Sequence, residues 1–271
     1  MTTTTATVPG LPRSRSGAGR AFVAILRRDI YVTGKELPVF AAQVILQPLF
    51  MLFVFGKILT NLGYAQHGFV ELLFPGVVAF TAVLTALQST SFPLVLDFSF
   101  TKEIEDRLLA PIPVWLVAVE KMIFASLRAI IAGIVMFPIG VAVLGSIPWR
   151  VSGLPLLIAV MVLGSLMGSA LGMCLGTLVP PERINILFAV ILTPLLFTGC
   201  TQYPWPSLSH LRWFQWVTAG NPLTYASEGM RAALVPSVPH IRPWVCLLML
   251  VGWLGVLSMI GIRGFLRRAI G

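Results

Sequence analysis

The chain has 271 residues, of which 57% are apolar and only 11% are charged, and its net charge is +9. A water-soluble domain carries about twice this fraction of charged residues, so the composition excludes a large soluble domain and predicts a polytopic membrane protein. The basic residues are spread along the chain rather than gathered in one block. This distribution argues against nucleic-acid binding and for a role in membrane topology.

Two segments precede the first predicted span. Residues 1–19 are rich in Thr, Ser, Gly and Pro, a composition that predicts a disordered tail. In residues 20–37, an apolar stripe of Phe22, Leu26 and Ile30 lies beside several Arg and Lys side chains. This pattern is typical of an amphipathic helix in the membrane interface, where basic groups attract anionic lipid headgroups.

The remaining residues, 38–271, are expected to form a single all-α membrane domain. Hydropathy predicts six transmembrane helices near 38–59, 72–96, 122–144, 153–179, 186–201 and 244–262. The third begins after the charged pair Glu120 and Lys121, and Arg128 in its first turns is expected to extend its charged end to the interface. Tryptophans and prolines in residues 202–243 predict short helices that lie on or dip into the outer leaflet before the last span.

Among the polar side chains of the first two predicted spans, five are singled out by their spacing: Gln43, Gln47, Thr81, Thr85 and Gln88. Within each span they recur at helical spacing, and a polar face in lipid needs a partner. These side chains are therefore expected at the interface between subunits, where they would join helices, or beside a path for the substrate.

The segment between the second and third spans, residues 99–113, has five charged side chains between positions 102 and 107. Each such charge costs ~2.5–3.5 kcal/mol at the bilayer centre, so this segment must lie outside the hydrocarbon. An apolar side chain at every fourth position predicts an amphipathic helix. We predict that the helix docks onto another protein; the alternative is a solvated helix that contacts only its own chain. The residues assigned to docking are Phe100, Lys102, Glu103, Ile104, Glu105, Asp106, Arg107 and Leu108.

Glycines recur every fourth residue in the fourth span, at Gly164, Gly168, Gly172 and Gly176. Small residues at this spacing allow the backbone of another helix to approach closely. The pattern predicts a tight helix–helix contact without indicating which helix forms its other side.

The run from Asn221 to Arg231 combines a helix start with two opposite charges. Asn221 suits the cap of a helix and Pro222 its first position. Glu228 and Arg231 are three residues apart, so they share one helix face. The run predicts a short helix with an internal ion pair; contact of these residues and Tyr225 with substrate is the alternative.

The distribution of Lys and Arg predicts the orientation of the chain. With six spans and both termini inside, thirteen of the 19 basic residues lie in the cytoplasm, five lie outside and Arg128 lies within a span. This arrangement satisfies the positive-inside rule. It predicts a multi-pass protein of the cell membrane with residues 99–113 on the cytoplasmic side.

From about residue 20 onward, the chain resembles permease subunits of the ABC-2 family of ATP-binding-cassette transporters, especially the branch that exports drugs and lipids. The most specific similarity is the run Asn221-Pro222-Leu223-Thr224-Tyr225 followed by Glu228 and Arg231, and Leu108-Leu109-Ala110-Pro111 is also similar. The resemblance implies two such subunits, identical or different, each seated on a cytoplasmic ATPase that uses ATP and Mg. The charged segment after the second span would then be the coupling helix that docks on the ATPase.

The sequence contains no His-Glu-x-x-His motif, no Gly-x-Ser-x-Gly motif and no P-loop. We therefore predict no catalytic residue, no metal site and no bound cofactor, with energy supplied by a separate ATPase. The predicted function is export of a hydrophobic or amphiphilic compound, such as a drug, a lipid or a lipid-linked product. The alternatives are export of a polysaccharide or glycolipid, and ion-coupled secondary transport.

Overall fold

The computed structural model describes residues 46–64, 68–98, 113–179 and 184–270, together with Val23, Leu26 and Arg27, and for 184–189 and 270 the backbone alone. The predicted tail, most of the predicted interfacial helix, Gln43 and the predicted docking helix lie outside these residues. Every regular element in the described ranges is a helix, which agrees with the all-α prediction.

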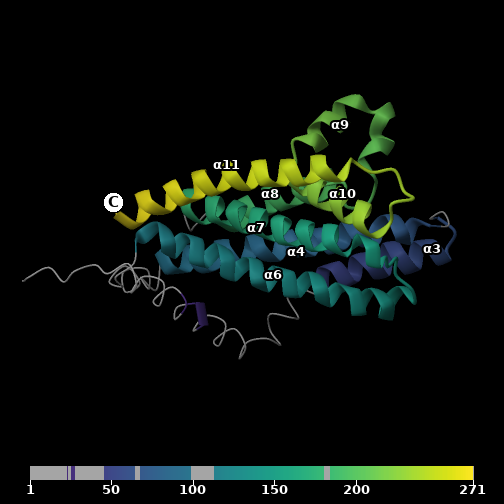
Figure 1. Ribbon diagram of the computed structural model, residues 1–271, viewed down its shortest axis with the longest axis horizontal. Helices are drawn as coiled ribbons and strands as arrows, with labels where there is room; N and C mark the ends of the chain where they lie inside the picture. The colour runs from purple at the N-terminus through teal and green to yellow at the C-terminus, as the bar shows by residue number, and fades with distance from the viewer. Residues whose placement is uncertain are drawn as a thin grey trace, which may run out of the picture.

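Long helices lie side by side in one bundle (Figure 1). The first described helix covers Leu46–Asn61 and includes the π-helical segment η1 (Leu52–Ile58) and α3 (Leu59–Asn61). The other long elements are α4 (Phe69–Leu96), α6 (Val114–Leu144), α7 (Leu154–Leu178), α8 (Ile184–Thr198) and α11 (Pro243–Ile270). Shorter helices join them: η3 (Val151–Gly153) before α7, then η5 (Trp205–His210), α9 (Arg212–Ala219) and α10 (Pro222–Leu234) between α8 and α11.

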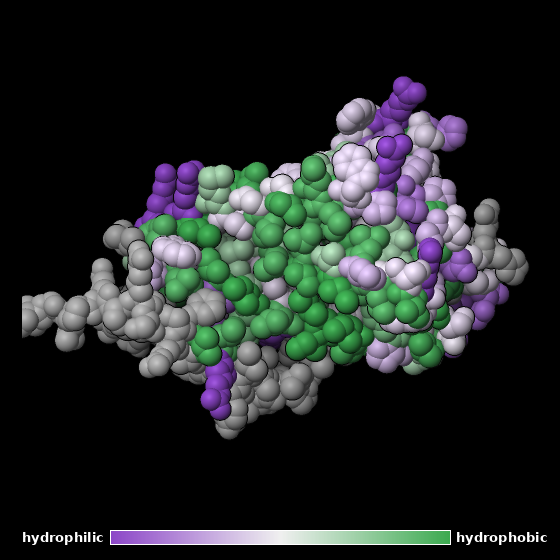
Figure 2. Space-filling model, viewed as in Figure 1, coloured by the Kyte–Doolittle hydropathy of each residue, from purple (hydrophilic) through white to green (hydrophobic). Residues whose placement is uncertain are grey.

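Four described helices are long and apolar enough to cross a membrane: α4, α6, α7 together with η3, and α11. They cover the predicted second, third, fourth and sixth spans. The described parts of the first and fifth predicted spans, Leu46–Asn61 and α8, are shorter apolar helices. Figure 2 shows apolar side chains covering the middle of one face of the bundle, with hydrophilic side chains gathered towards its two ends, as a membrane-embedded surface requires.

The predicted start of the third span near residue 122 is wrong, because α6 begins at Val114. Glu120 and Lys121 therefore lie inside this helix, and both are buried. A hydropathy window stops at two adjacent charges, but the helix tolerates Lys121 because its ammonium group lies 2.6 Å from the Asp97 carboxylate just beyond α4. Arg128 is half-buried, with its guanidinium 5.9 Å from the centre of the Phe124 ring.

The helix α4 lies at the centre of the bundle, in contact with α6, α7 and α10. Of its apolar membrane segment, 83% is buried inside the protein. The corresponding shares are 28% for α6 and 22% for α11. An apolar helix in a membrane can face either lipid or other helices, and α4 is the one that other helices of the chain surround most fully. Movements of α4 would therefore act on most of the bundle.

The glycines of α7 lie mainly against α4. A Cβ atom at Gly168 would lie 2.6 Å from the Val83 carbonyl oxygen, and one at Gly172 would collide with the Leu87 carbonyl. Gly176 faces Leu94 and Ser91 in the same way, whereas Gly164 faces Ala226 of α10. The other side of the predicted contact is thus α4 of the same chain.

Different helices begin and finish at the two ends of the bundle. We call one the C-terminal end, where α4 and α7 finish, α6 starts and Phe98 contacts Phe265 of α11. At the other, the α10 end, Arg231 reaches the first turns of α4 and α8 finishes against Asn221. α9 projects from the bundle at this end (Figure 1).

Candidate functional site

The first turn of α10 is fixed by Asn221, which lies at its N-cap. The Asn221 side-chain oxygen accepts a hydrogen bond from the Leu223 backbone N–H at 2.9 Å, and Pro222 occupies the first helical position. A proline there loses no hydrogen bond, because the first N–H groups of a helix have no partner within it. The Asn221 amide nitrogen donates to the Leu195 carbonyl at 2.9 Å and to the Thr198 hydroxyl at 2.8 Å. One side chain therefore starts α10 and holds the end of α8.

Two turns further on, Glu228 and Arg231 form an ion pair whose side chains have no exposed surface. The Glu228 carboxylate also accepts hydrogen bonds from the backbone N–H groups of Trp205 at 3.0 Å and Ile241 at 2.9 Å. These two N–H groups belong to the start of η5 and to the segment that leads into α11. A buried carboxylate is stable only when charges and donors of this kind replace its water.

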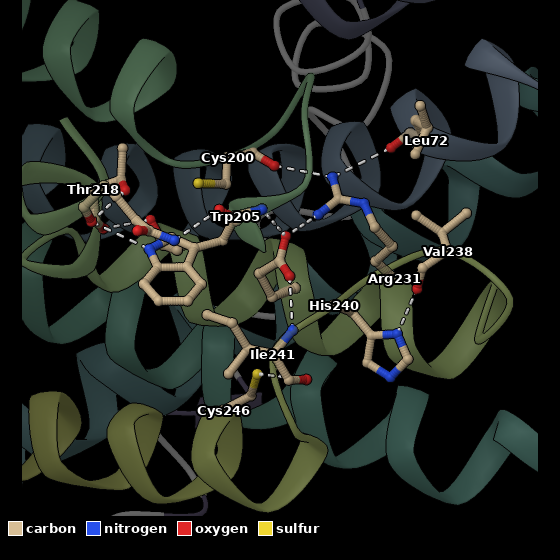
Figure 3. Close-up of polar contacts among 12 residues, drawn as sticks. Leu72, Cys200, Trp205, Thr218, Arg231, Val238, His240, Ile241 and Cys246 are labelled. Carbon is tan, nitrogen blue, oxygen red and sulfur yellow. Dashed lines mark hydrogen bonds and ion pairs between the residues drawn. The ribbon is translucent and has the colours of Figure 1, made fainter. Parts of the chain in front are cut away.

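Arg231 extends the network in the opposite direction (Figure 3). Its guanidinium donates to the Cys200 carbonyl at 2.9 Å, just after α8, and to the Leu72 carbonyl at 3.3 Å, in the first turn of α4. The ion pair thus ties α10 to α4, α8, η5 and α11. Removing either charge would leave the other buried without its partner.

Further hydrogen bonds make α9 and α10 one unit. The Thr224 hydroxyl donates to the Thr218 carbonyl at 2.7 Å, and the Tyr225 hydroxyl donates to the Ala219 carbonyl at 2.6 Å. The indole N–H of Trp205 donates to the Gln215 carbonyl at 3.2 Å. The junction of the two helices is therefore fixed by side chains at both sides of it.

The far side of α9 is open. Trp213 is 69% exposed and Trp216 is 77% exposed, three residues apart on this short helix. Tryptophan prefers the boundary between membrane and water. This exposure agrees with a helix that lies at a membrane surface.

Glycines allow α10 to fit between its neighbours. A Cβ atom at Gly153 would collide with the Ala233 carbonyl, and one at Gly229 would lie 2.8 Å from the Val160 side chain. At Gly76 of α4 a Cβ atom would collide with the Thr201 carbonyl. These three glycines follow no repeat, so their roles could not be predicted from the sequence. The contributions of Leu72, Cys200, Trp205 and Ile241 could not be predicted either, because they come from main-chain groups that any residue type possesses.

The polar side chains of this network contact one another and the surrounding main chain. In the described part of the chain, no three His, Cys, Asp or Glu side chains gather as metal ligands would. The three cysteines are buried and free. Every contact of Glu228 and Arg231 described above is internal, which favours a structural role over substrate contact.

The predicted polar face is divided between two environments. Thr81 and Thr85 are buried within the chain, and the Thr81 hydroxyl donates to the Val77 carbonyl at 2.8 Å. Gln88 is half-buried. Gln47 is exposed and lines a pocket of about 90 Å³ between the first described helix, α4 and α8. The other lining residues are Phe80, Leu84, Leu192, Thr193, Leu196 and Phe197. Of the four described candidates, only Gln47 lines this pocket; Thr81, Thr85 and Gln88 do not.

Comparison with known proteins places this architecture in a family. The sequence profile of the ABC-2 type transporter family matches residues 20–235, a stretch that ends just after α10. A protein of Cyanophora paradoxa described as a putative transport permease, ycf38, is 27% identical over an alignment of 218 positions that covers 76% of this chain and 72% of that protein. The inner membrane transport permease YadH of Escherichia coli strain K12 is 23% identical over an alignment of 188 positions that covers 66% of this chain and 68% of YadH. Since the family profile extends over most of the 271 residues and includes the long apolar helices α4, α6 and α7, the chain belongs to the ABC-2 type transporter family.

Proposed function

We propose that this chain is the permease subunit of an exporter that moves a hydrophobic or amphiphilic compound out of the cytoplasm. The compound would be a drug, a lipid or a lipid-linked product. A separate ATPase would supply the energy by hydrolysing ATP with Mg, and this chain would bind no cofactor. The C-terminal end of the bundle would face the cytoplasm, with both chain termini, and the α10 end would face outward.

The observation that carries this proposal is the position of the charged segment in the chain. Residues 99–112 connect Phe98, which follows α4, to Pro113, which precedes α6. Because α4 is the most buried of the four long helices, a force applied to this segment would act on the centre of the bundle. The ATPase would therefore reach the outer parts of the membrane domain through α4.

The pocket beside Gln47 supports an amphiphilic cargo. Its walls are mainly Phe and Leu side chains, with one amide and the Thr193 hydroxyl as polar groups. This is the usual composition of a small-molecule site, but its volume of about 90 Å³ is well below the ~300–1,000 Å³ of a complete site. We propose that a second permease subunit, identical or different, completes the route on this face.

Reconstitution with a candidate ATPase tests the proposal. The two proteins are co-expressed, purified by a tag on this chain and placed in liposomes, and uptake of a fluorescent lipid is measured with ATP added outside. Reversing the charges with Glu105→Lys and Asp106→Lys should abolish recovery of the ATPase and ATP-dependent transport. The matched control is Glu71→Lys, because Glu71 is an exposed acidic residue at the opposite end of α4.

Two results would count against the proposal. ATP-driven transport by this chain without any ATPase would remove the need for a partner. Transport driven by an ion gradient in the absence of ATP would support a secondary transporter instead. Movement of a sugar-linked lipid but not of simple lipids would retain the mechanism and change the class of cargo.

A further inference from the structure

A buried ion pair joins the two helices that flank residues 99–112. The Lys121 ammonium group of α6 donates to the Asp97 carboxylate at 2.6 Å, and these residues are only 9% and 7% exposed. They are 24 positions apart in the sequence. The pair therefore brings together the two helices that this segment, proposed to receive the ATPase, connects in the sequence.

The next residue, Phe98, joins the same place to α11. Its ring packs edge-on against Phe265, with the two ring centres 5.5 Å apart. The Arg268 guanidinium, also from α11, lies over the Phe98 ring, 4.9 Å from the ring centre. A cation that lies over an aromatic ring is attracted by the negative charge of the ring face.

Arg268 also holds the end of α7. Its guanidinium donates to the Gly176 carbonyl at 3.2 Å and to the Val179 carbonyl at 3.4 Å. Carbonyl groups in the last turn of a helix have no partner within it, and they carry partial negative charge that favours a cation. One arginine of α11 therefore contacts both α7 and the residue that follows α4.

We propose that Asp97, Phe98, Lys121, Phe265 and Arg268 form a clasp that makes the ends of α4, α6, α7 and α11 move as one body. The role of the clasp rests on the proposed function: a displacement of residues 99–112 by the ATPase would be passed to four helices together. Its members are positioning residues, since they act by holding helix ends. A buried ion pair suits this task, because it adds little net stability compared with apolar packing but permits a single geometry.

Hydrogen exchange of the full chain in lipid nanodiscs tests the clasp directly. Arg268→Gln removes the cation from Phe98 and from the end of α7. Asp97→Asn removes the negative charge from the ion pair with Lys121 of α6 and leaves at most a neutral acceptor. If the five residues act together, Arg268→Gln should speed exchange in residues 114–121 of α6, and Asp97→Asn should speed it in residues 262–268 of α11. We expect about fivefold in each case, the size of the coupling usual for residues in one network.

The controls separate coupling from general loosening. Arg267→Gln removes an exposed arginine next in sequence to Arg268 and should leave exchange in α6 unchanged. Arg268→Lys keeps the cation and should retain most of the protection. If Arg268→Gln fails to fold, Phe98→Leu replaces it, because it keeps apolar volume and removes both ring contacts.

The outcomes also separate the clasp from the proposed function. Faster exchange confined to the helices that each mutated residue touches would overturn the clasp, whether or not an ATPase is found. Faster exchange at the distant helix would support it even if the chain captured no ATPase, a result that would instead refute the proposed function. In the complex with ATPase, the clasp requires that Asp97→Asn lower the amount of lipid moved per ATP hydrolysed, and the reversed pair Asp97→Lys with Lys121→Asp should recover part of this ratio. An unchanged ratio would contradict it.

Discussion

Replacement of Glu228 by glutamine should destabilise the protein strongly although the two side chains have nearly the same shape. The change leaves the Arg231 cation buried with no carboxylate beside it. Loss of one partner of a buried ion pair costs about 3–5 kcal/mol. In addition, the amide NH₂ group must face one of the two backbone N–H groups, of Trp205 or Ile241, that the carboxylate now accepts from. Leaving one such donor without an acceptor costs about 1–3 kcal/mol.

A second variant tests the electrostatic part of this reasoning. Adding Arg231→Met to Glu228→Gln removes the buried cation as well. Because an ion pair replaced as a whole is often nearly neutral, the double variant should be more stable than Glu228→Gln alone, by roughly 1–2 kcal/mol. It should remain less stable than the wild type, since the Cys200 and Leu72 carbonyls lose their donor.

Unfolding by SDS in mixed micelles gives the comparison, with Glu71→Gln as the control. Glu71 is exposed, so its replacement should change stability by no more than about 0.5 kcal/mol. A Glu228→Gln variant as stable as this control would refute the reasoning. A double variant less stable than Glu228→Gln alone would show that the hydrogen bonds, rather than the charges, hold the network.

Three further predictions follow from single residues. Gly168→Ala should lower stability by about 1–3 kcal/mol in the same assay, because its methyl group would meet the Val83 carbonyl, whereas Gly252→Ala, with nothing within 4 Å, should not. Asn221→Ala should lower stability by about 1–3 kcal/mol through loss of the helix cap and of the bonds to α8. Cys200 should react with maleimide at pH 8 only after unfolding, because its thiol is buried and the reagent needs an accessible thiolate.

The long helices could be predicted from the sequence because continuous apolar stretches are a local signal. The error at the start of α6 has a physical cause. Two charges adjacent in sequence, Glu120 and Lys121, end any hydropathy window, yet Lys121 is acceptable inside the bundle because Asp97 lies beside it. A partner 24 residues away has no local signature. The same reasoning explains why the glycine spacing predicted a close contact but gave no indication that α4 forms the other side.

The α10 network was predictable in part. Asn221 and Pro222 have the helix-start chemistry that the structure contains, and the spacing of Glu228 and Arg231 allows their pairing. The remaining partners are main-chain N–H and carbonyl groups of distant segments, at Trp205, Ile241 and Cys200. Those groups are present at nearly every residue, so composition cannot identify which of them the pair will use.

The features at the two ends of α4 suggest how this helix would transmit movement. Internal prolines lie near both ends, at Pro75 and Pro93, and each interrupts a backbone hydrogen bond and allows bending there. Between them, Gly168 and Gly172 bring the backbone of α7 against α4. The middle of α4 should therefore move together with α7, because separation would break close backbone packing. Bending should concentrate at the prolines, because beyond them Lys121 holds Asp97 at one end and Arg231 holds the Leu72 carbonyl at the other. A push at residues 99–112 would then arrive at α10 as a displacement of the packed α4–α7 pair rather than as a distortion within it.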